Sequence, residues 1–261
     1  MRERCADPLA SFRSGPEGII DLSEKLITGV ARRDALKYLA QDGGGRAEPS
    51  EVLVTGVTLR DADLRRARLT LARLLDLDAQ RVRLDGATAI EARLSRVNLA
   101  GASLRQTNFQ AVLARDCDFS SADLVGARWY GGTAIRCSFA GAELVDLGAD
   151  RAVFLDCDLQ GVDLSVGELG ARVTMTGAQF LRCDLRWSRW EDRTLTGVRF
   201  VGCKLHGVMG APQFEGVVID DPDLSPEGDG TQPGSLDEVL ALWGANASGR
   251  LTSAALHEEA S

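Results

Sequence analysis

The side chains that could do chemistry are few and scattered in this 261-residue sequence. Its two histidines are His206 and His257, and neither completes a Ser-His-Asp or Cys-His arrangement that could activate a nucleophile. The sequence contains no glycine-rich phosphate loop, GxGxxG motif or HExxH motif. It therefore predicts no catalytic, cofactor-binding or metal-binding residue, and we expect a protein that is not an enzyme.

Cysteines are the other candidates for chemistry. Five of the six repeat at intervals of twenty residues in two groups, Cys117, Cys137 and Cys157, then Cys183 and Cys203. A zinc site needs three or four ligands that converge on one point. A regular interval instead places the thiols in a line, at one position of successive structural repeats. We predict buried free thiols that pack as small apolar groups, with a metal or redox site as the alternative.

Carboxylates are numerous, but their spacing does not indicate a site. The acidic stretch 220–229 lacks the ligand and glycine spacing of an EF-hand loop, so we interpret it as a solvated end of the fold, with a cation site as the alternative. Asp63 and Asp163 each directly precede a large apolar residue. We expect such carboxylates to accept hydrogen bonds from the backbone of a turn, and not to act as catalytic pairs.

A five-residue period describes the elements that must hold these side chains. Large apolar residues recur at this interval in a series that begins Leu59, Leu64, Leu69, Leu74. A small residue, most often Ala, stands two positions before each, frequently with Asp or Asn between. Five is a multiple of neither 3.6 nor 2, so neither one helix nor one long strand accounts for the pattern. A chain that turns a corner every five residues does, because both the large and the small residue can point inward.

These residues resemble the pentapeptide-repeat family, whose consensus is A(D/N)LXX, over residues 52–225. The resemblance implies an all-β solenoid, a right-handed quadrilateral β-helix with four pentapeptides per coil and about eight coils, with short helical elements at both ends. One extra residue after Leu169 and one deletion before Phe214 interrupt the register. We therefore expect three parts: an N-terminal segment over 1–50, the β-helix over 51–225, and a C-terminal linker, short helix and disordered tail over 226–261.

Both ends carry helix signals. The segment 14–41 begins with a capping box at Ser14 and is predicted to form a helical hairpin, followed by a Gly-rich linker, that either plugs the first coil or docks a partner. A second capping box at Ser235 begins a short helix. Its apolar positions could plug the last coil or, as the resemblance implies, form a homodimer contact, and they are Leu236, Val239, Leu240 and Trp243.

Charge and hydropathy limit the location and the partners. The net charge is −8, which argues against a broad basic surface for direct nucleic-acid binding. No run of roughly 18 apolar residues is present, so we expect no membrane insertion. The first residues lack the apolar core of a secretory signal, which predicts a cytoplasmic location.

Charge is also uneven along the chain. Residues 51–115 hold 11 Arg against 7 acidic residues, whereas residues 116–230 hold 10 basic against 19 acidic residues. The resemblance implies a DNA mimic that binds bacterial gyrase or topoisomerase IV and protects it from fluoroquinolone-like inhibitors. The candidate DNA-mimic surface consists of Asp116, Asp146, Asp150, Asp156, Glu191 and Asp192.

An apolar stripe offers a different surface. The side predicted from Leu74, Leu94, Ala114, Ala134, Phe154 and Thr174 places aliphatic residues at outward positions, namely Leu113, Ile135, Val153, Leu155 and Val173. A contiguous exposed patch of this kind is typical of an interface, covered either by the N-terminal hairpin or by another protein. The sequence thus supports two hypotheses: an adaptor or scaffold that binds a protein through this stripe, and the gyrase-binding DNA mimic.

Overall fold

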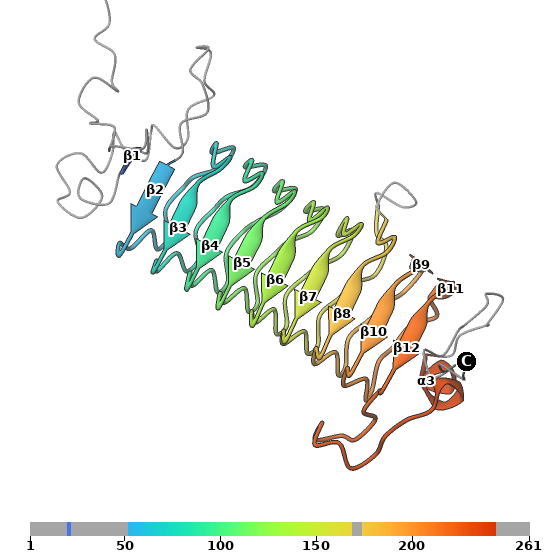
Figure 1. Ribbon diagram of the computed structural model, residues 1–261. Helices are drawn as coiled ribbons and strands as arrows, with labels where there is room; N and C mark the ends of the chain where they lie inside the picture. The colour runs from blue at the N-terminus through green and yellow to red at the C-terminus, as the bar shows by residue number, and fades with distance from the viewer. Residues whose placement is uncertain (1–19, 22–51, 169–173, 244–261) are drawn as a thin grey trace, which may run out of the picture.

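The computed structural model describes residues 20–21, 52–168 and 174–243, most of which form a four-sided parallel β-solenoid of about eight turns (Figure 1). We number its sides 1 to 4 in chain order. Side 1 is a ten-stranded parallel sheet with the order β1-β2-β3-β4-β5-β6-β7-β8-β10-β12, and side 4 carries a two-stranded parallel sheet of β9 and β11. The corner at every fifth residue and the β-solenoid that the family resemblance implied are thereby confirmed.

The strands are short and evenly placed. Side 1 consists of β1 (Ile20–Asp21), β2 (Val52–Thr55), β3 (Arg73–Leu75), β4 (Arg93–Ser95), β5 (Leu113–Arg115), β6 (Thr133–Ile135), β7 (Val153–Leu155), β8 (Gln179–Leu181), β10 (Arg199–Val201) and β12 (Val218–Asp220). On side 4 lie β9 (Thr194–Thr196) and β11 (Gln213–Glu215). The only helix among the described residues is α3 (Leu236–Leu242).

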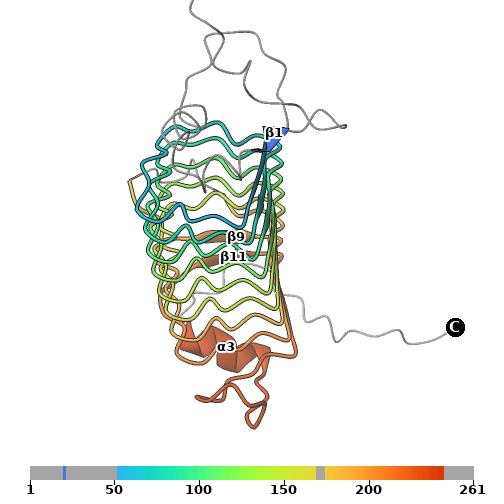
Figure 2. The ribbon, with the colours of Figure 1, turned by 90° about the vertical axis from the view of Figure 1, so that its left-hand side faces the viewer.

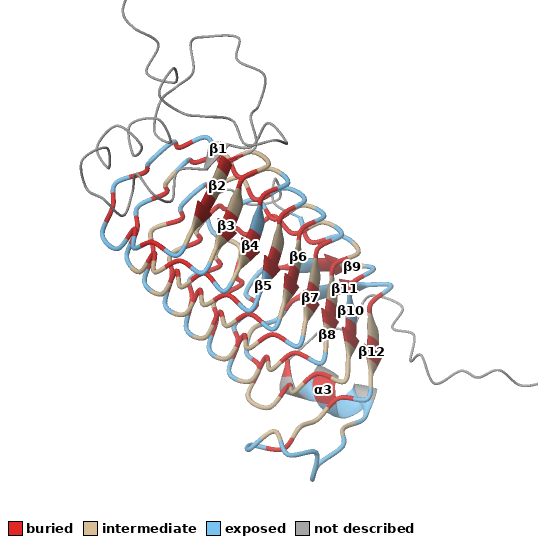
Figure 3. Ribbon diagram, turned by 60° about the vertical axis from the view of Figure 1, so that its left-hand side comes forward, coloured by how far each residue is buried: buried red, intermediate tan, exposed pale blue. Residues whose placement is uncertain are grey.

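A tight turn at each corner explains the period of five. After the central residue Leu59, Asp61 adopts φ 57°, and the N–H of Ala62 donates to the Leu59 carbonyl at 3.0 Å. A left-handed third residue with this hydrogen bond is the geometry of a type II turn. The turn points both the central residue and the small residue after the corner inward, so buried and outward positions alternate (Figure 3).

The Asp residues before central positions support these corners. Asp163 Oδ1 accepts the backbone N–H of Ser165 at 2.9 Å, and Asp63 Oδ1 accepts that of Arg65 at 3.3 Å. This confirms the predicted role of these carboxylates in the turns.

The expected register is wrong at one place. Phe154 pairs with Phe180 on side 1, and not with Thr174. The step from Leu164 to the next inward central residue, Met175, is eleven residues, because six residues are added there and not one. The deletion before Phe214 is confirmed, since Phe214 pairs with Leu195 nineteen residues earlier.

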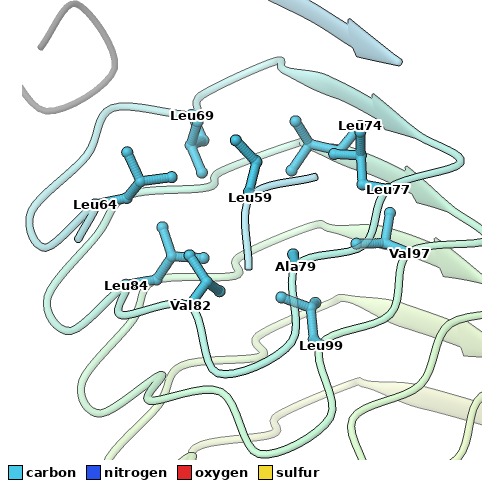
Figure 4. A pocket seen from close by; sticks show the side chains of 10 residues that line it. All are labelled: Leu59, Leu64, Leu69, Leu74, Leu77, Ala79, Val82, Leu84, Val97 and Leu99. Carbon is cyan, nitrogen blue, oxygen red and sulfur yellow. The ribbon is translucent and has the colours of Figure 1, made fainter. Parts of the chain in front are cut away.

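The core changes character along the axis. Toward the C-terminal end, aromatic rings stack from coil to coil, with ring centroids 5.1 Å apart for Phe154 and Phe180 and 5.2 Å apart for Phe180 and Phe200. The first coils instead use Leu and Ala. They enclose an apolar cavity of about 20 Å³ (Figure 4), lined by Leu59, Leu64, Leu69, Leu74, Leu77, Ala79, Val82, Leu84, Val97 and Leu99.

The two ends differ from each other. At the N-terminal end, Ile20 and Asp21 are extended and pair with β2, so the helix expected over 14–41 is wrong for these two residues, and the rest of that segment lies outside the described residues. At the other end, α3 lies against the last coils (Figure 2) and begins with the predicted capping box at Ser235. No helix in the described part of the chain is long and apolar enough to cross a membrane.

Candidate functional site

The outer surface of side 1 carries two rows of side chains, one before and one after the buried central residues. In the first row, Leu113, Thr133 and Val153 are neighbours on β5, β6 and β7. In the second row, four aliphatic residues are neighbours on successive strands, and they are Ile135, Leu155, Leu181 and Val201. All of these side chains are half-buried. We call Leu113, Ile135, Val153, Leu155, Leu181 and Val201 the aliphatic stripe.

Most of the stripe was predicted from the sequence, and part of it was missed. Leu113, Ile135, Val153 and Leu155 lie on the expected side and face outward. Val173 lies outside the described residues, and the strand that follows β7 is β8, so Leu181 takes the place that the sequence register gave to another segment. Leu181 and Val201 become visible as members only when the six-residue insertion is recognised.

Ion pairs border the second row along the corner between sides 1 and 2. Arg136 binds both carboxylate oxygens of Asp116 at 2.7 and 2.9 Å, and Arg182 binds those of Asp156 at the same distances. The hydrogen bonds from Arg136 lower the pKa of Asp116. These corner charges therefore neutralise each other beside the stripe, and a polar border around an apolar centre is typical of protein interfaces.

The candidate DNA-mimic surface is not assembled on one face. Asp116 and Asp156 lie on the corner after side 1, each in an ion pair with an arginine. Asp146 is 3 % exposed and accepts the N–H of Gly167 at 2.7 Å. Asp150, on side 4, accepts hydrogen bonds from Thr174 and Thr176.

Glu191 and Asp192, the other two residues of that candidate surface, are exposed on side 3 and on the corner that follows it. The six acidic residues thus occupy different sides, and several are already bound by neighbours. They do not form the dense, one-sided array of negative charge that a DNA mimic requires.

The cysteines behave as predicted from their spacing. The five cysteines are buried and free, and each stands at the inward position directly after the corner between sides 1 and 2, namely Cys117, Cys137, Cys157, Cys183 and Cys203. The Sγ of Cys183 donates to the Phe154 carbonyl at 3.3 Å, and that of Cys203 to the Phe180 carbonyl at 3.2 Å. Hydrogen bonding to the Cys137 thiol, together with burial, raises the pKa of Cys117 and Cys157 well above the usual range of a thiol. Cys117 and Cys157 are therefore protonated core side chains at neutral pH.

No group of three or more metal-ligating side chains occurs among the residues that the structure describes. One buried charge that the sequence analysis missed is Arg193, which is 1 % exposed and occupies an inward position usually filled by Ala. Its Nε donates to the Leu164 carbonyl at 2.6 Å, and burial lowers its pKa to about 10. It lies beside the coil that contains the insertion.

The candidate dimer contact is occupied within the chain itself. Val239 and Trp243 are fully buried, and the Trp243 ring lies 5.5 Å from that of Phe200 and 5.4 Å from that of Phe214. These two side chains close the last coils, so they are not available to a second copy. The side chains of Leu236 and Leu240 lie outside the described residues.

A comparison with protein-family models finds repeats of the same five-residue length. The model of the family described as pentapeptide repeats matches in eight copies over residues 54–88 and 92–128. No curated protein matches the chain.

Several solved structures match parts of the chain. HetL, a pentapeptide-repeat protein involved in heterocyst differentiation regulation in the cyanobacterium Nostoc sp. strain PCC 7120, is 18% identical, with 67% of this chain and 84% of HetL covered and a TM-score of 0.34. A trypsin-treated form of QnrB1, a plasmid-mediated fluoroquinolone resistance protein, is 12% identical, with 77% and 80% covered and a TM-score of 0.40. Rfr23 from the cyanobacterium Cyanothece 51142 is 22% identical, with 49% and 70% covered and a TM-score of 0.25.

The eight matched repeats lie in the first half of the solenoid, and the corners at every fifth residue continue the same geometry beyond them to Asp221. The chain thus carries pentapeptide repeats of that family over residues 54–88 and 92–128.

Proposed function

We propose that this protein is a non-catalytic adaptor or scaffold that binds a protein partner through the aliphatic stripe on side 1. The observation that carries the proposal is the second row, in which Ile135, Leu155, Leu181 and Val201 stand on four neighbouring strands. Soluble proteins seldom expose a contiguous patch of large aliphatic side chains without a partner for it.

The solenoid makes this patch a favourable place to bind. Each stripe residue flanks a buried central residue of the same strand, as Val153 and Leu155 flank Phe154. Their backbones are held on both sides by parallel pairing. A surface that is already ordered loses little conformational entropy when a partner docks, so more of the energy of apolar burial appears as affinity.

The alternative of a gyrase-binding DNA mimic has no comparable observation in its favour. Its candidate carboxylates are distributed over different sides, and Asp116 and Asp156 are each paired with an arginine at 2.7 Å. The arrangement of the side chains therefore favours the adaptor function.

Site-specific photo-crosslinking in the native host tests the proposal. A photoreactive residue at position 155 or 181 is expected to capture a defined protein, whereas one at Gln160 on side 2 is not. The captured protein is then purified, and its affinity for the chain is measured. Leu155→Arg is expected to abolish binding, and the matched variant Gln160→Arg to leave it unchanged. If Leu155→Arg binds as the wild type does, the stripe is not the interface.

A further inference from the structure

In both rows of side 1, an arginine follows the aliphatic stripe on the side of the N-terminal coils. In the first row, Arg93 on β4 is the register partner of Leu113. In the second row, Arg115 on β5 is the register partner of Ile135. Both arginines are exposed. A ligand that covers the stripe and extends toward β3 would therefore meet two cationic groups directly after the aliphatic side chains.

These two arginines differ from the arginines on the corners. Arg96, Arg136 and Arg182 each hold an aspartate of the preceding coil, whereas Arg93 and Arg115 form no ion pair with any described residue. Glu91 is exposed on the corner before β4 and is not paired with Arg93. The cationic end of the stripe thus retains charge that a ligand can neutralise.

The charges around the rest of the stripe do not cancel the positive charge of Arg93 and Arg115. Arg151 is exposed on the corner before Val153 and adds a further positive group along the first row. At the far end, Arg199 on β10 and Asp220 on β12 contribute one charge of each sign. Charge complementarity therefore favours an acidic ligand, with its carboxylates over β4 and β5.

The spacing of the rows favours a helix over an extended chain. Neighbouring strands of a sheet lie about 4.8 Å apart, so the second row presents one aliphatic side chain at each such interval. A helix laid along the solenoid axis returns a side chain to the same face about every 5.4 Å, whereas one face of a strand repeats at about 6.7 Å. Over the three intervals from Ile135 to Val201 the mismatch is about 2 Å for the helix and about 6 Å for the strand.

We infer that the stripe receives an amphipathic helix of a partner protein, aligned with the solenoid axis, whose apolar face covers Ile135 to Val201 and whose acidic end binds Arg93 and Arg115. The inference rests on the proposed function and adds the chemistry and shape of the partner. The helix contributes one aliphatic residue per turn to the second row, and carboxylates in its adjoining turn.

Binding of designed peptides to the full chain tests this inference. The first probe is an 18-residue helical peptide with leucines on one face and three glutamates in its terminal turn. A second peptide replaces the three glutamates with lysines, and a third has the composition of the first but alternates apolar and polar residues as a strand does. Dissociation constants are measured by fluorescence anisotropy at low salt.

Variants of the protein test the same contacts from the side of the stripe. The double variant Arg93→Glu/Arg115→Glu reverses the cationic end of the stripe. Arg128→Glu makes the same change at an exposed position of side 4 and serves as the control. Leu155→Arg interrupts the second row itself.

The expected result is that the glutamate peptide binds at least about tenfold more tightly than the lysine peptide, since two exposed pairs change from attraction to repulsion. The double variant is expected to reverse this preference, and Arg128→Glu to retain it. Equal binding of both helical peptides, or a double variant that binds as the wild type does, overturns the acidic helix. Tighter binding of the strand-patterned peptide that is lost in Leu155→Arg overturns the helix and leaves the stripe as the interface.

If no peptide binds, the helical ligand is overturned, and the photo-crosslinking experiment decides separately whether the stripe binds another kind of partner. The failure of this inference is thereby distinguishable from the failure of the proposed function.

Discussion

The indole of Trp129 lies against the α-carbon of Gly132, so closely that a β-carbon at position 132 would stand 2.6 Å from Trp129 Cδ1. The glycine occupies an inward position after the corner, where the other coils have Ala or Val. The indole in turn packs between aromatic rings, with centroids 5.0 Å from Phe109 and 5.8 Å from Phe139. The absence of a β-carbon at position 132 thus makes room for one of the three buried tryptophans of the core.

Gly132→Ala is therefore expected to destabilise the protein by about 1–3 kcal/mol, the usual effect of overpacking a filled core. Urea unfolding monitored by circular dichroism measures this. The double variant Trp129→Leu/Gly132→Ala serves as the control, because the alanine costs less once the indole is removed. An equal effect of the alanine in both backgrounds would show that the indole contact is not its cause.

The cavity in the first coils predicts the opposite response to a larger side chain. Ala79 lines this cavity, so Ala79→Val is expected to stabilise the protein by up to about 1 kcal/mol. Ala134 is also a central alanine, but it is fully buried between Ala114 and Phe154, so Ala134→Val is expected to destabilise the protein by about 1–3 kcal/mol. Thermal unfolding of the two variants compares them directly, and a melting temperature lowered by Ala79→Val would contradict the prediction.

An exposed ion pair gives a prediction for pH. Hydrogen bonds from Arg65, at 2.8 and 2.7 Å, lower the pKa of Asp63 to about 2 from its ordinary 3.8. Since the folded pKa is below the unfolded one, the contribution of the pair to stability is complete above pH 3.8 and is lost as the pH falls through 2.

Carboxyl NMR titration measures the pKa of Asp63 directly. Arg65→Gln is expected to raise it toward 3.8. Arg81→Gln, which removes the partner of Asp61, is expected to leave Asp63 unchanged. A wild-type Asp63 that titrates near 3.8 would show that the pair does not form in solution.

The buried cysteines predict slow thiol chemistry. In a Cys5→Ser background, the five core thiols are expected to be inert toward a disulfide reagent at pH 8 and to react completely in denaturant. Burial and a raised pKa both remove the reactive thiolate, as at Cys117 and Cys157. The measurement is the absorbance of the released reagent over time. Rapid reaction of the native protein would be inconsistent with the closed core.

The five-residue period was sufficient to place the inward residues as far as Leu164, because every corner repeats the same turn. It could not locate the insertion correctly, since six added residues displace a five-residue register by one, as a single added residue does. The pairing of Phe154 with Phe180 distinguishes the two. This error concealed Leu181 and Val201, and with them half of the second row.

The sequence did not show that the acidic residues lie on different sides, and the reason is a different one. Residues twenty positions apart occupy one corner column, and that column alternates Asp76, Arg96, Asp116, Arg136 and Asp156. Counting charges along the chain shows an excess of acidic residues. In the folded protein, however, aspartates and arginines of this column lie on successive coils and form ion pairs. This alternation of Asp and Arg could have been found in the sequence by comparing residues twenty positions apart. Burial of Val239 and Trp243 had no such signal, because a plug and a dimer contact require the same apolar helix face.

The stacked aromatic rings that end at Trp243 predict that the solenoid unfolds from one end. In a solenoid each coil contacts only its neighbours, so the stability of the fold is approximately the sum of the contributions of individual coils and of the interfaces between adjacent coils. Stacked rings hold the coils from Phe109 to Phe214, whereas leucines and a cavity hold the first ones. Fraying would thus begin near β2 and advance toward α3, and amide hydrogen exchange would slow progressively along the chain.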